Sequence, residues 1–276
     1  MNRRRVPLAL LALFSACASW QLPVSAQSVV SLSAVATAGK QRMLSQRVLK
    51  AYSQLVLGVM PEKASIILSS SVDELRSANA LLQSQAKAPL DTDLRAQAAL
   101  VDKLAAVVSA PPTAKGLQQA VVLSEELLLN AETVTQGFIK AGGDAPSAMV
   151  NLAAKQRMLS QRAAAAYLVY QTEARSPEMK ARATSSARQF MAALSVFEDA
   201  KAEFPAIADR IDLARMQMIF FDNALSNIDN PRKEQFTTVA ATSERVLSEM
   251  DLMTRDFIKQ LATRNATASP ATGKKP

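Results

Sequence analysis

An eight-residue segment occurs twice in this chain, letter for letter, and it constrains the fold more than any other feature. Lys-Gln-Arg-Met-Leu-Ser-Gln-Arg occupies residues 40–47 and again residues 155–162, an offset of 115 residues. A second similarity relates residues 124–140 to residues 243–259, at an offset of 119 residues. The simplest interpretation is that the chain contains two copies of one unit, with a few residues inserted in the second copy.

The composition favours helices and argues against nucleic-acid binding. Apolar residues make up 49% of the 276 residues, yet only 7 residues are glycine and 5% are aromatic. This balance favours helices with cores of small and medium side chains. The formal net charge is +8, of which Arg3, Arg4 and Arg5 carry three charges. The rest of the chain shows no concentrated basic stripe of the kind that nucleic-acid-binding proteins use.

The first 26 residues have the pattern of an export signal. The arginines precede a short apolar run at residues 6–14, and Val24-Ser25-Ala26 resembles a small-residue cleavage site. We therefore predict cleavage after Ala26 and a periplasmic mature protein. The single cysteine, Cys17, lies within this segment, so the mature chain would have no disulfide. No later stretch is long and apolar enough to cross a membrane.

Proline and glycine divide the rest of the chain into eight predicted helices. Ser176-Pro177 and Asn230-Pro231 each look like a cap residue followed by a proline in the first helical turn. The predicted helices are residues 29–58, 62–86, 91–109, 114–140, 147–172, 177–200, 205–227 and 232–264.

The expected fold class is all-α. Apolar residues follow helical spacing in the fourth helix, at Leu117, Val121, Leu128, Val134 and Phe138. Short connections between long helices favour antiparallel neighbours, which predicts two tandem antiparallel four-helix bundles. One elongated eight-helix bundle is the alternative. The predicted divisions are a signal peptide (1–26), a first unit (27–143), a second unit (144–265) and a disordered tail (266–276).

An arginine and a glutamine interrupt a packing seam in each copy. On a helical wheel the repeated segment places them in successive layers of an otherwise apolar stripe. One turn before each arginine stands a small residue, Gly39 or Ala154, which would let a backbone or a ligand come close. The stripe consists of Val35, Gly39, Arg42, Gln46, Leu49 and Val56 in the first copy, and of Val150, Ala154, Arg157, Gln161, Ala164 and Leu168 in the second.

Arg42 and Arg157 need partners, because burying an unpaired charge is heavily penalised. One candidate is a carboxylate on a neighbouring helix, such as Glu125 or its repeat counterpart Glu244. The other is an external anion, since the planar guanidinium fork suits flat or tetrahedral oxyanions. The spacing alone leaves both alternatives open, and structural ion pairs are the commoner of the two.

The other polar residues of the segment have simpler interpretations. Arg47 and Arg162 lie about 140° round the helix from Arg42 and Arg157, which predicts a solvated or interhelical ion-pair position. Ser45 and Ser160 could donate to a ligand, although a serine more often bonds the backbone of its own helix.

At residues 38–47, Ala-Gly-Lys-Gln-Arg-Met-Leu-Ser-Gln-Arg, the sequence resembles the PilJ-type sensor domains of type IV pilus methyl-accepting transducers. These domains are similar to the four-helix nitrate/nitrite-sensing domain of NarX-like histidine kinases. Each half of the chain resembles one such module in length and helix count. The resemblance therefore extends over most of the mature protein, as two tandem PilJ-like units.

The resemblance implies a ligand and a way to hold it. In the nitrate sensors, paired motif helices meet at a dimer interface and their arginines clasp the anion. By motif position this role falls on Arg42 and Arg157, beside Gly39 and Ala154, with Gln46 and Gln161 in the next layer. The tandem copies would supply within one chain the two helices that a dimer supplies elsewhere, and a homodimer stays open. Two departures are the alanine at Ala154 and the lack of flanking membrane segments and an output domain.

The residue inventory argues against an enzyme. The chain contains no histidine, and its only cysteine lies in the predicted signal segment, which excludes thiol and histidine nucleophiles and the usual zinc sites. No carboxylate pair or glycine-rich phosphate loop is singled out, so we predict no enzyme activity, no cofactor and no metal. The leading hypothesis is an exported sensor-like protein that binds a small anionic ligand and signals through a membrane receptor or histidine kinase. The alternative is a helical interaction module for pilus or chemosensory components, with structural arginines.

Overall fold

The computed structural model describes residues 24–86, 90–142 and 146–268, and these residues form long helices. The first four are α1 (Val24–Leu57), α2 (Pro61–Gln85), α3 (Leu90–Val108) and α4 (Ala114–Gly142). The others are α5 (Pro146–Tyr170), α6 (Pro177–Ala200), α7 (Ala208–Ser226) and α8 (Lys233–Ala268), with a short 3₁₀ turn, η1 (Pro205–Ile207), before α7. No strand occurs among the described residues, so the prediction of an all-α fold is confirmed.

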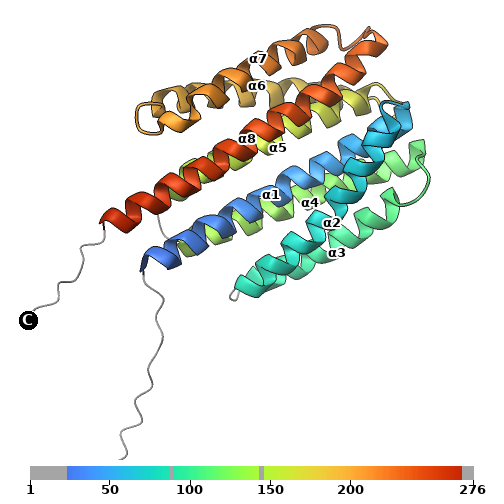
Figure 1. Cartoon of the computed structure of the whole chain (residues 1–276). Helices are drawn as coiled ribbons and strands as arrows, with labels where there is room; N and C mark the ends of the chain where they lie inside the picture. Colours follow the sequence, from blue (N-terminus) through green and yellow to red (C-terminus); the bar gives the residue numbers. More distant parts are fainter. Residues whose placement is uncertain (1–23, 87–89, 143–145, 269–276) are drawn as a thin grey trace, which may run out of the picture.

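The helices pack consistently with two four-helix bundles. In the first unit α1 contacts α2 and α4, and α3 contacts α2 and α4. The second unit repeats this scheme, since α5 and α7 each contact α6 and α8. The bundles lie side by side, with α2 and α3 on one flank and α6 and α7 on the other (Figure 1). Their principal contact is α1 against α5, and α8 also touches α1.

Local sequence explains where the helices begin and end. α1 stops at Gly58, whose φ of 67° is favoured by glycine, and the Val59 amide bonds the Gln54 carbonyl at 2.8 Å. Ser176 caps α6 as predicted, because its side chain accepts a hydrogen bond from the Met179 amide. The matching prediction for Pro231 is wrong, since α8 begins only at Lys233.

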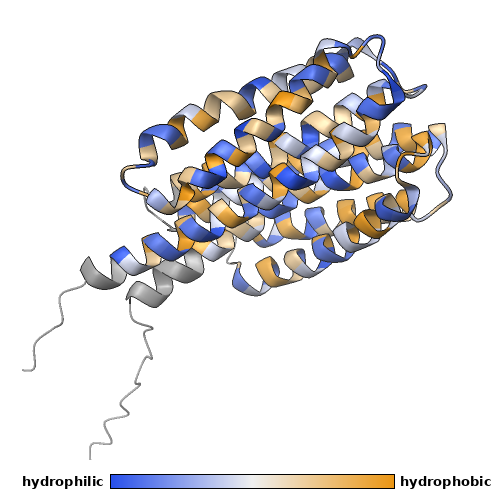
Figure 2. Ribbon diagram, turned by 45° about the horizontal axis from the view of Figure 1, so that its top comes forward, coloured by the Kyte–Doolittle hydropathy of each residue, from blue (hydrophilic) through white to orange (hydrophobic). Residues whose placement is uncertain are grey.

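The predicted stripe lies at the centre of the molecule. Arg42 and Gln46 have 0% exposure, and Arg157 and Gln161 have 4% and 0%. α1 is buried on further sides as well, at Met43, Leu44, Val48 and Tyr52, because α2, α4, α5 and α8 surround it. The outer helices are amphipathic, and hydrophilic and hydrophobic residues alternate along their ribbons (Figure 2).

Two sequence predictions fall largely outside the described residues. Residues 1–23 of the predicted signal peptide are not described, and Val24–Ala26 appear only as the beginning of α1. Of the predicted tail, residues 269–276 are not described, whereas residues 266–268 belong to α8. Within the described part of the chain, none of the helices combines the length and the apolar character that spanning a membrane requires.

Candidate functional site

The two motif helices face each other at Gly39 of α1 and Ala154 of α5. A Cβ atom built on Gly39 would lie only 2.7 Å from the Ala154 Cβ. The same point lies 3.1 Å from Arg42 Nη2 and 3.9 Å from Arg157 Nη2. The glycine therefore lets the helices approach closely, and the two repeated arginines converge on this contact. We call Gly39, Arg42, Ala154 and Arg157 the arginine junction.

Arg42 makes hydrogen bonds both within its own unit and with the other unit. Its Nη1 donates to Glu132 Oε2 of α4 at 2.5 Å, and its Nη2 donates to Asn151 Oδ1 of α5 at 2.7 Å. The guanidinium is almost fully enclosed, with 1% of the side chain exposed, whereas the Glu132 side chain is 44% exposed. The buried guanidinium of Arg42 is therefore paired with the carboxylate of Glu132, which is partly exposed at the surface.

Arg157 makes the corresponding contacts in the second unit. Its Nη1 donates to Asp251 Oδ1 of α8 at 2.7 Å, and its Nη2 donates to the Ala36 carbonyl of α1 at 3.0 Å. Glu132 and Asp251 are 119 residues apart, and Ala36 and Asn151 are 115 residues apart, so the partners obey the repeat offsets. The junction is thus nearly symmetric, except that Arg42 meets a side-chain amide where Arg157 meets a backbone carbonyl.

One nitrogen of each arginine has no hydrogen-bond partner in the part of the chain that the structure describes. Arg42 Nε and Arg157 Nε are buried and make no hydrogen bond with any described residue. In an arginine, Nε and Nη2 form one edge of the fork, and a carboxylate or oxyanion can accept from both at once. Arg47 uses this edge on Glu244, at 3.1 Å from Nε and 2.6 Å from Nη2. The arginine junction therefore contains two buried N–H groups, one on each arginine, from which no described residue accepts a hydrogen bond.

Burial and charge oppose each other at the junction. Burial lowers the pKa of Arg42, and Glu132 offsets part of this effect while the nearby Arg157 adds to it. Burial would raise the pKa of Glu132, but the charge and hydrogen bond of Arg42 outweigh it, with help from Gln136, and hold that pKa below its usual value. Each of the two groups thus favours the charged form of the other.

The glutamines and serines of the motif bond to the bundle itself. Gln46 Nε2 donates to the Ser124 carbonyl at 3.3 Å, and Gln161 Nε2 to the Ser243 carbonyl at 2.9 Å. Ser45 and Ser160 donate to the carbonyls of Arg42 and Arg157 in their own helices, at 2.8 and 2.9 Å. The serines thus adopt the backbone-bonded arrangement that sequence reasoning preferred.

The other arginine of the motif in the first unit, Arg47, forms an ion pair with a residue of the second unit. Arg47 donates to both carboxylate oxygens of Glu244 in α8, and Lys50 bonds the same carboxylate and Ser243 Oγ. Burial lowers the pKa of the fully enclosed Lys50 to about 8, against the opposing effect of Glu244. Burial would raise the pKa of Glu244, but Lys50 and Arg47 overcome this and lower it to about 2.

Arg162 makes the reciprocal contact. Its Nη2 donates to Glu125 Oε2 of α4 at 2.8 Å, and Arg182 of α6 lies 2.8 Å from the other oxygen. The prediction of an interhelical ion-pair position for Arg47 and Arg162 is confirmed.

Glu125 and Glu244, named from the sequence as carboxylate partners of Arg42 and Arg157, are instead the partners of Arg162 and Arg47. That pairing was wrong because the glutamines, one turn after Arg42 and Arg157, bond the carbonyls of the residues that precede these glutamates, which places the glutamates one layer away from those arginines.

Sequence reasoning missed Glu132, Asp251, Asn151 and Lys50. For the first two a signal existed, since they are related by the 119-residue offset and keep their charge, although their letters differ. Asn151 corresponds to Ala36, and Lys50 to Ala165. These two positions break the repeat, so an alignment of identical residues passes over them.

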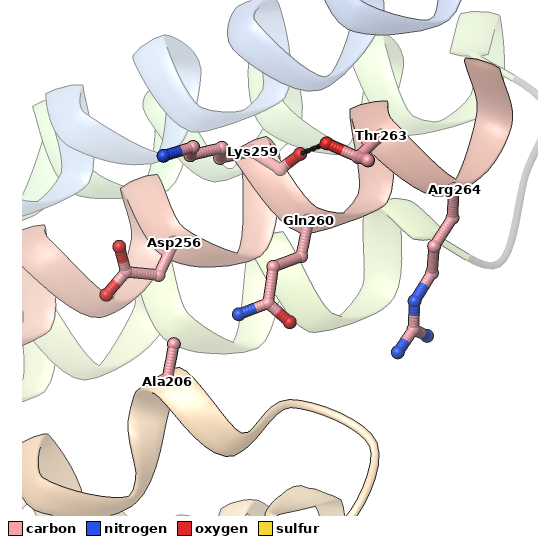
Figure 3. Close-up of a pocket in the computed structure, with 6 residues that line it drawn as sticks. All are labelled: Ala206, Asp256, Lys259, Gln260, Thr263 and Arg264. Atoms are coloured by element: carbon pink, nitrogen blue, oxygen red, sulfur yellow. Dashed lines mark hydrogen bonds between the residues drawn. The ribbon is translucent and has the colours of Figure 1, made fainter. Parts of the chain in front are cut away.

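A concave feature lies between α8 and η1, apart from the arginine junction. Asp256, Lys259, Gln260, Thr263 and Arg264 line it from α8, and Ala206 lines it from η1 (Figure 3). Its volume is about 340 Å³. Asp256 is paired with Arg210 at 2.7 Å, and Arg264 is paired with Glu203 and stacks over Phe204. None of the residues that line it contributes a buried nitrogen donor without a partner among the described residues, as Arg42 and Arg157 do, so the arginine junction is the stronger candidate.

Comparison with known proteins bears on the first unit. Residues 24–126 match the family model PilJ, described as the type IV pili methyl-accepting chemotaxis transducer N-term. This range covers α1 to α3 and part of α4, and it includes the first motif segment with Arg42. The match does not extend to the second copy. No curated protein and no solved structure matches the chain.

Proposed function

We propose that the chain is an exported, non-catalytic sensory protein that binds a small oxyanion, of the nitrate or nitrite type, at the arginine junction. It would pass its bound state to a membrane receptor or histidine kinase. The match of residues 24–126 to a chemotaxis-transducer sensor module supports the sensory role. We also propose that residues 144–265 form a second unit of the same kind, because the contacts of Arg157 repeat those of Arg42.

The observation that carries this proposal is the pair of buried Nε donors that have no partner among the described residues. Leaving a buried donor unsatisfied costs about 1–3 kcal/mol, so a ligand that bonds Arg42 Nε and Arg157 Nε recovers a penalty already present in the fold. The arginines belong to facing helices, as a clasp requires. Gly39 and Ala154 let the two helices approach closely, because neither presents a side chain larger than a methyl group at the contact.

The charge balance bears on the kind of ligand. Glu132 and Asp251 neutralise the two arginines, so the junction as a whole has little net attraction for an anion. We therefore expect selectivity for ions that accept several directed hydrogen bonds, such as planar oxyanions, over ions that offer charge alone.

Calorimetric titration with nitrate, nitrite and other oxyanions tests the proposal. The intact protein should bind at least one of them, and Arg42→Ala/Arg157→Ala should not. Arg42→Lys/Arg157→Lys, which keeps the charges but loses the fork, should also bind far more weakly, and circular dichroism shows whether each variant is folded. Arg95→Ala, which removes an exposed arginine of α3, serves as the matched control. Absence of heat with every anion, or undiminished binding by the folded double variants, contradicts the proposal.

A second function is favoured by a different observation. Each junction arginine has a carboxylate partner on α4 or α8, Glu132 or Asp251, as expected if the arginines only hold the bundles together. The chain would then be a helical interaction module for pilus or chemosensory components. In that case the double variants lose stability, and no oxyanion changes the melting temperature of the intact protein.

A further inference from the structure

We infer that Asn151 determines the specificity of the arginine junction by supplying a third, uncharged donor to the bound ion. This inference rests on the proposed oxyanion site and adds a residue to it. Asn151 lies on α5 one turn before Ala154, and its Oδ1 accepts from Arg42 Nη2 at 2.7 Å. It is thus held against the guanidinium on which the proposed ligand depends.

The side-chain amide of Asn151 has capacity to spare. A primary amide carries two donor hydrogens on Nδ2 in addition to its acceptor oxygen. The contact with Arg42 uses only the oxygen, and Asn151 Nδ2 donates to none of the described residues. Because the oxygen is fixed on Arg42, the amide nitrogen stays beside the junction, where an oxygen of a bound ion can accept from it.

The repeat supplies an internal comparison. At the position of Asn151, the first copy has Ala36, which offers Arg157 only its backbone carbonyl. A main-chain carbonyl can orient an arginine but cannot donate to a ligand. The two arginines are therefore held in comparable ways, while only the Asn151 side adds a donor. The junction is asymmetric in its donors although it is nearly symmetric in its charges.

The third donor discriminates between ions of the same charge. A planar oxyanion with three acceptor oxygens can bond Arg42, Arg157 and Asn151 together. A halide is attracted to the arginines but gains little from one more neutral donor. Since a hydrogen bond to a charged group changes affinity roughly tenfold or more, Asn151 should raise nitrate affinity relative to chloride affinity.

The test is titration of the full chain and its Asn151 variants with sodium nitrate and with sodium chloride. Asn151→Ala should lower nitrate affinity roughly tenfold and leave chloride affinity nearly unchanged. Asn151→Asp keeps an oxygen for Arg42 but replaces the donor by a negative charge, so it should abolish nitrate binding in a folded protein. Asn79→Ala, the same substitution at a buried polar residue of α2, should leave the ratio of the two affinities unchanged.

The outcomes separate this inference from the proposed function. Equal losses for nitrate and chloride in Asn151→Ala, or nitrate binding retained by Asn151→Asp, overturn the role of Asn151 while the oxyanion site stands. Failure of the intact protein to bind any oxyanion overturns both. A fall in the nitrate-to-chloride ratio with Asn151→Ala, together with loss of nitrate binding in Asn151→Asp, supports the inference.

Discussion

Arg47 of α1 donates hydrogen bonds from Nε and Nη2 to Glu244 of α8, although the two residues belong to different units. The reciprocal pair, Arg162 with Glu125, crosses in the opposite direction. Arg42 and Arg157 instead bond carboxylates of their own units and reach across with Nη2. Two layers of the repeated motif therefore join the two bundles.

Loss of Glu244 should destabilise the fold more than loss of Glu125. Glu244→Ala leaves Lys50 buried without a carboxylate, since its side chain has no exposed surface, and breaking a buried pair in this way costs about 3–5 kcal/mol. Glu125→Ala leaves Arg162 and Arg182, which are 26% and 12% exposed, and should cost about 1–2 kcal/mol. Urea unfolding at neutral pH compares them, and equal losses would show that Lys50 escapes to solvent.

The depressed pKa of Glu244 predicts acid sensitivity. Its pKa lies at about 2 in the folded chain against 4.5 as a reference, so the folded state binds fewer protons between these values. Its stabilising contribution is complete above about pH 4.5 and is lost as the pH falls toward 2, on the order of 3 kcal/mol in total. Unfolding free energies measured across this window should fall more steeply for the intact protein than for Glu244→Gln. Parallel curves would contradict the assignment.

Lys50 predicts a second rise of the unfolding free energy with pH, at alkaline pH. Burial lowers its pKa from 10.5 to about 8, so between these values the unfolded chain holds a proton that the folded chain has lost. The unfolding free energy should therefore rise with pH across this window. Lys50→Ala, which copies Ala165 of the second unit, should remove the rise. A rise of the same size in Lys50→Ala would assign it to another group.

Much of this architecture follows from the sequence because a helix forms through interactions between residues that are close together in the chain. Proline and glycine mark the helix ends, and the residues at 3.6-residue spacing predicted the buried stripe of Arg42 and Arg157. The partners of those arginines are not local. Glu132 and Asp251 become neighbours only through the packing of α4 and α8. Glu132 and Asp251 share a charge and the offset of 119 residues but not their residue type. The contact of α1 with α5 is marked in each helix only by one small residue, Gly39 or Ala154.

Substitution of Gly39 tests the contact at the centre of the molecule. Alanine favours a helix over glycine by roughly 1 kcal/mol, so Gly39→Ala would stabilise an isolated α1. In the folded chain its Cβ would lie 2.7 Å from Ala154 Cβ and 3.1 Å from Arg42 Nη2. A short, rigid methyl group cannot move aside as the end of a long side chain can, and we expect a net loss of about 1–3 kcal/mol.

The double variant Gly39→Ala/Ala154→Gly distinguishes this clash from a local effect on α1. Removing the methyl group of Ala154 opens the space that the new one requires, so stability should recover by more than the sum of the two single changes predicts. Such a coupling is the expected sign of direct contact between two residues. Additive losses in urea unfolding would mean that α1 and α5 do not meet at these residues. The proposed oxyanion site, which needs Arg42 and Arg157 on facing helices, would then lose its geometric basis.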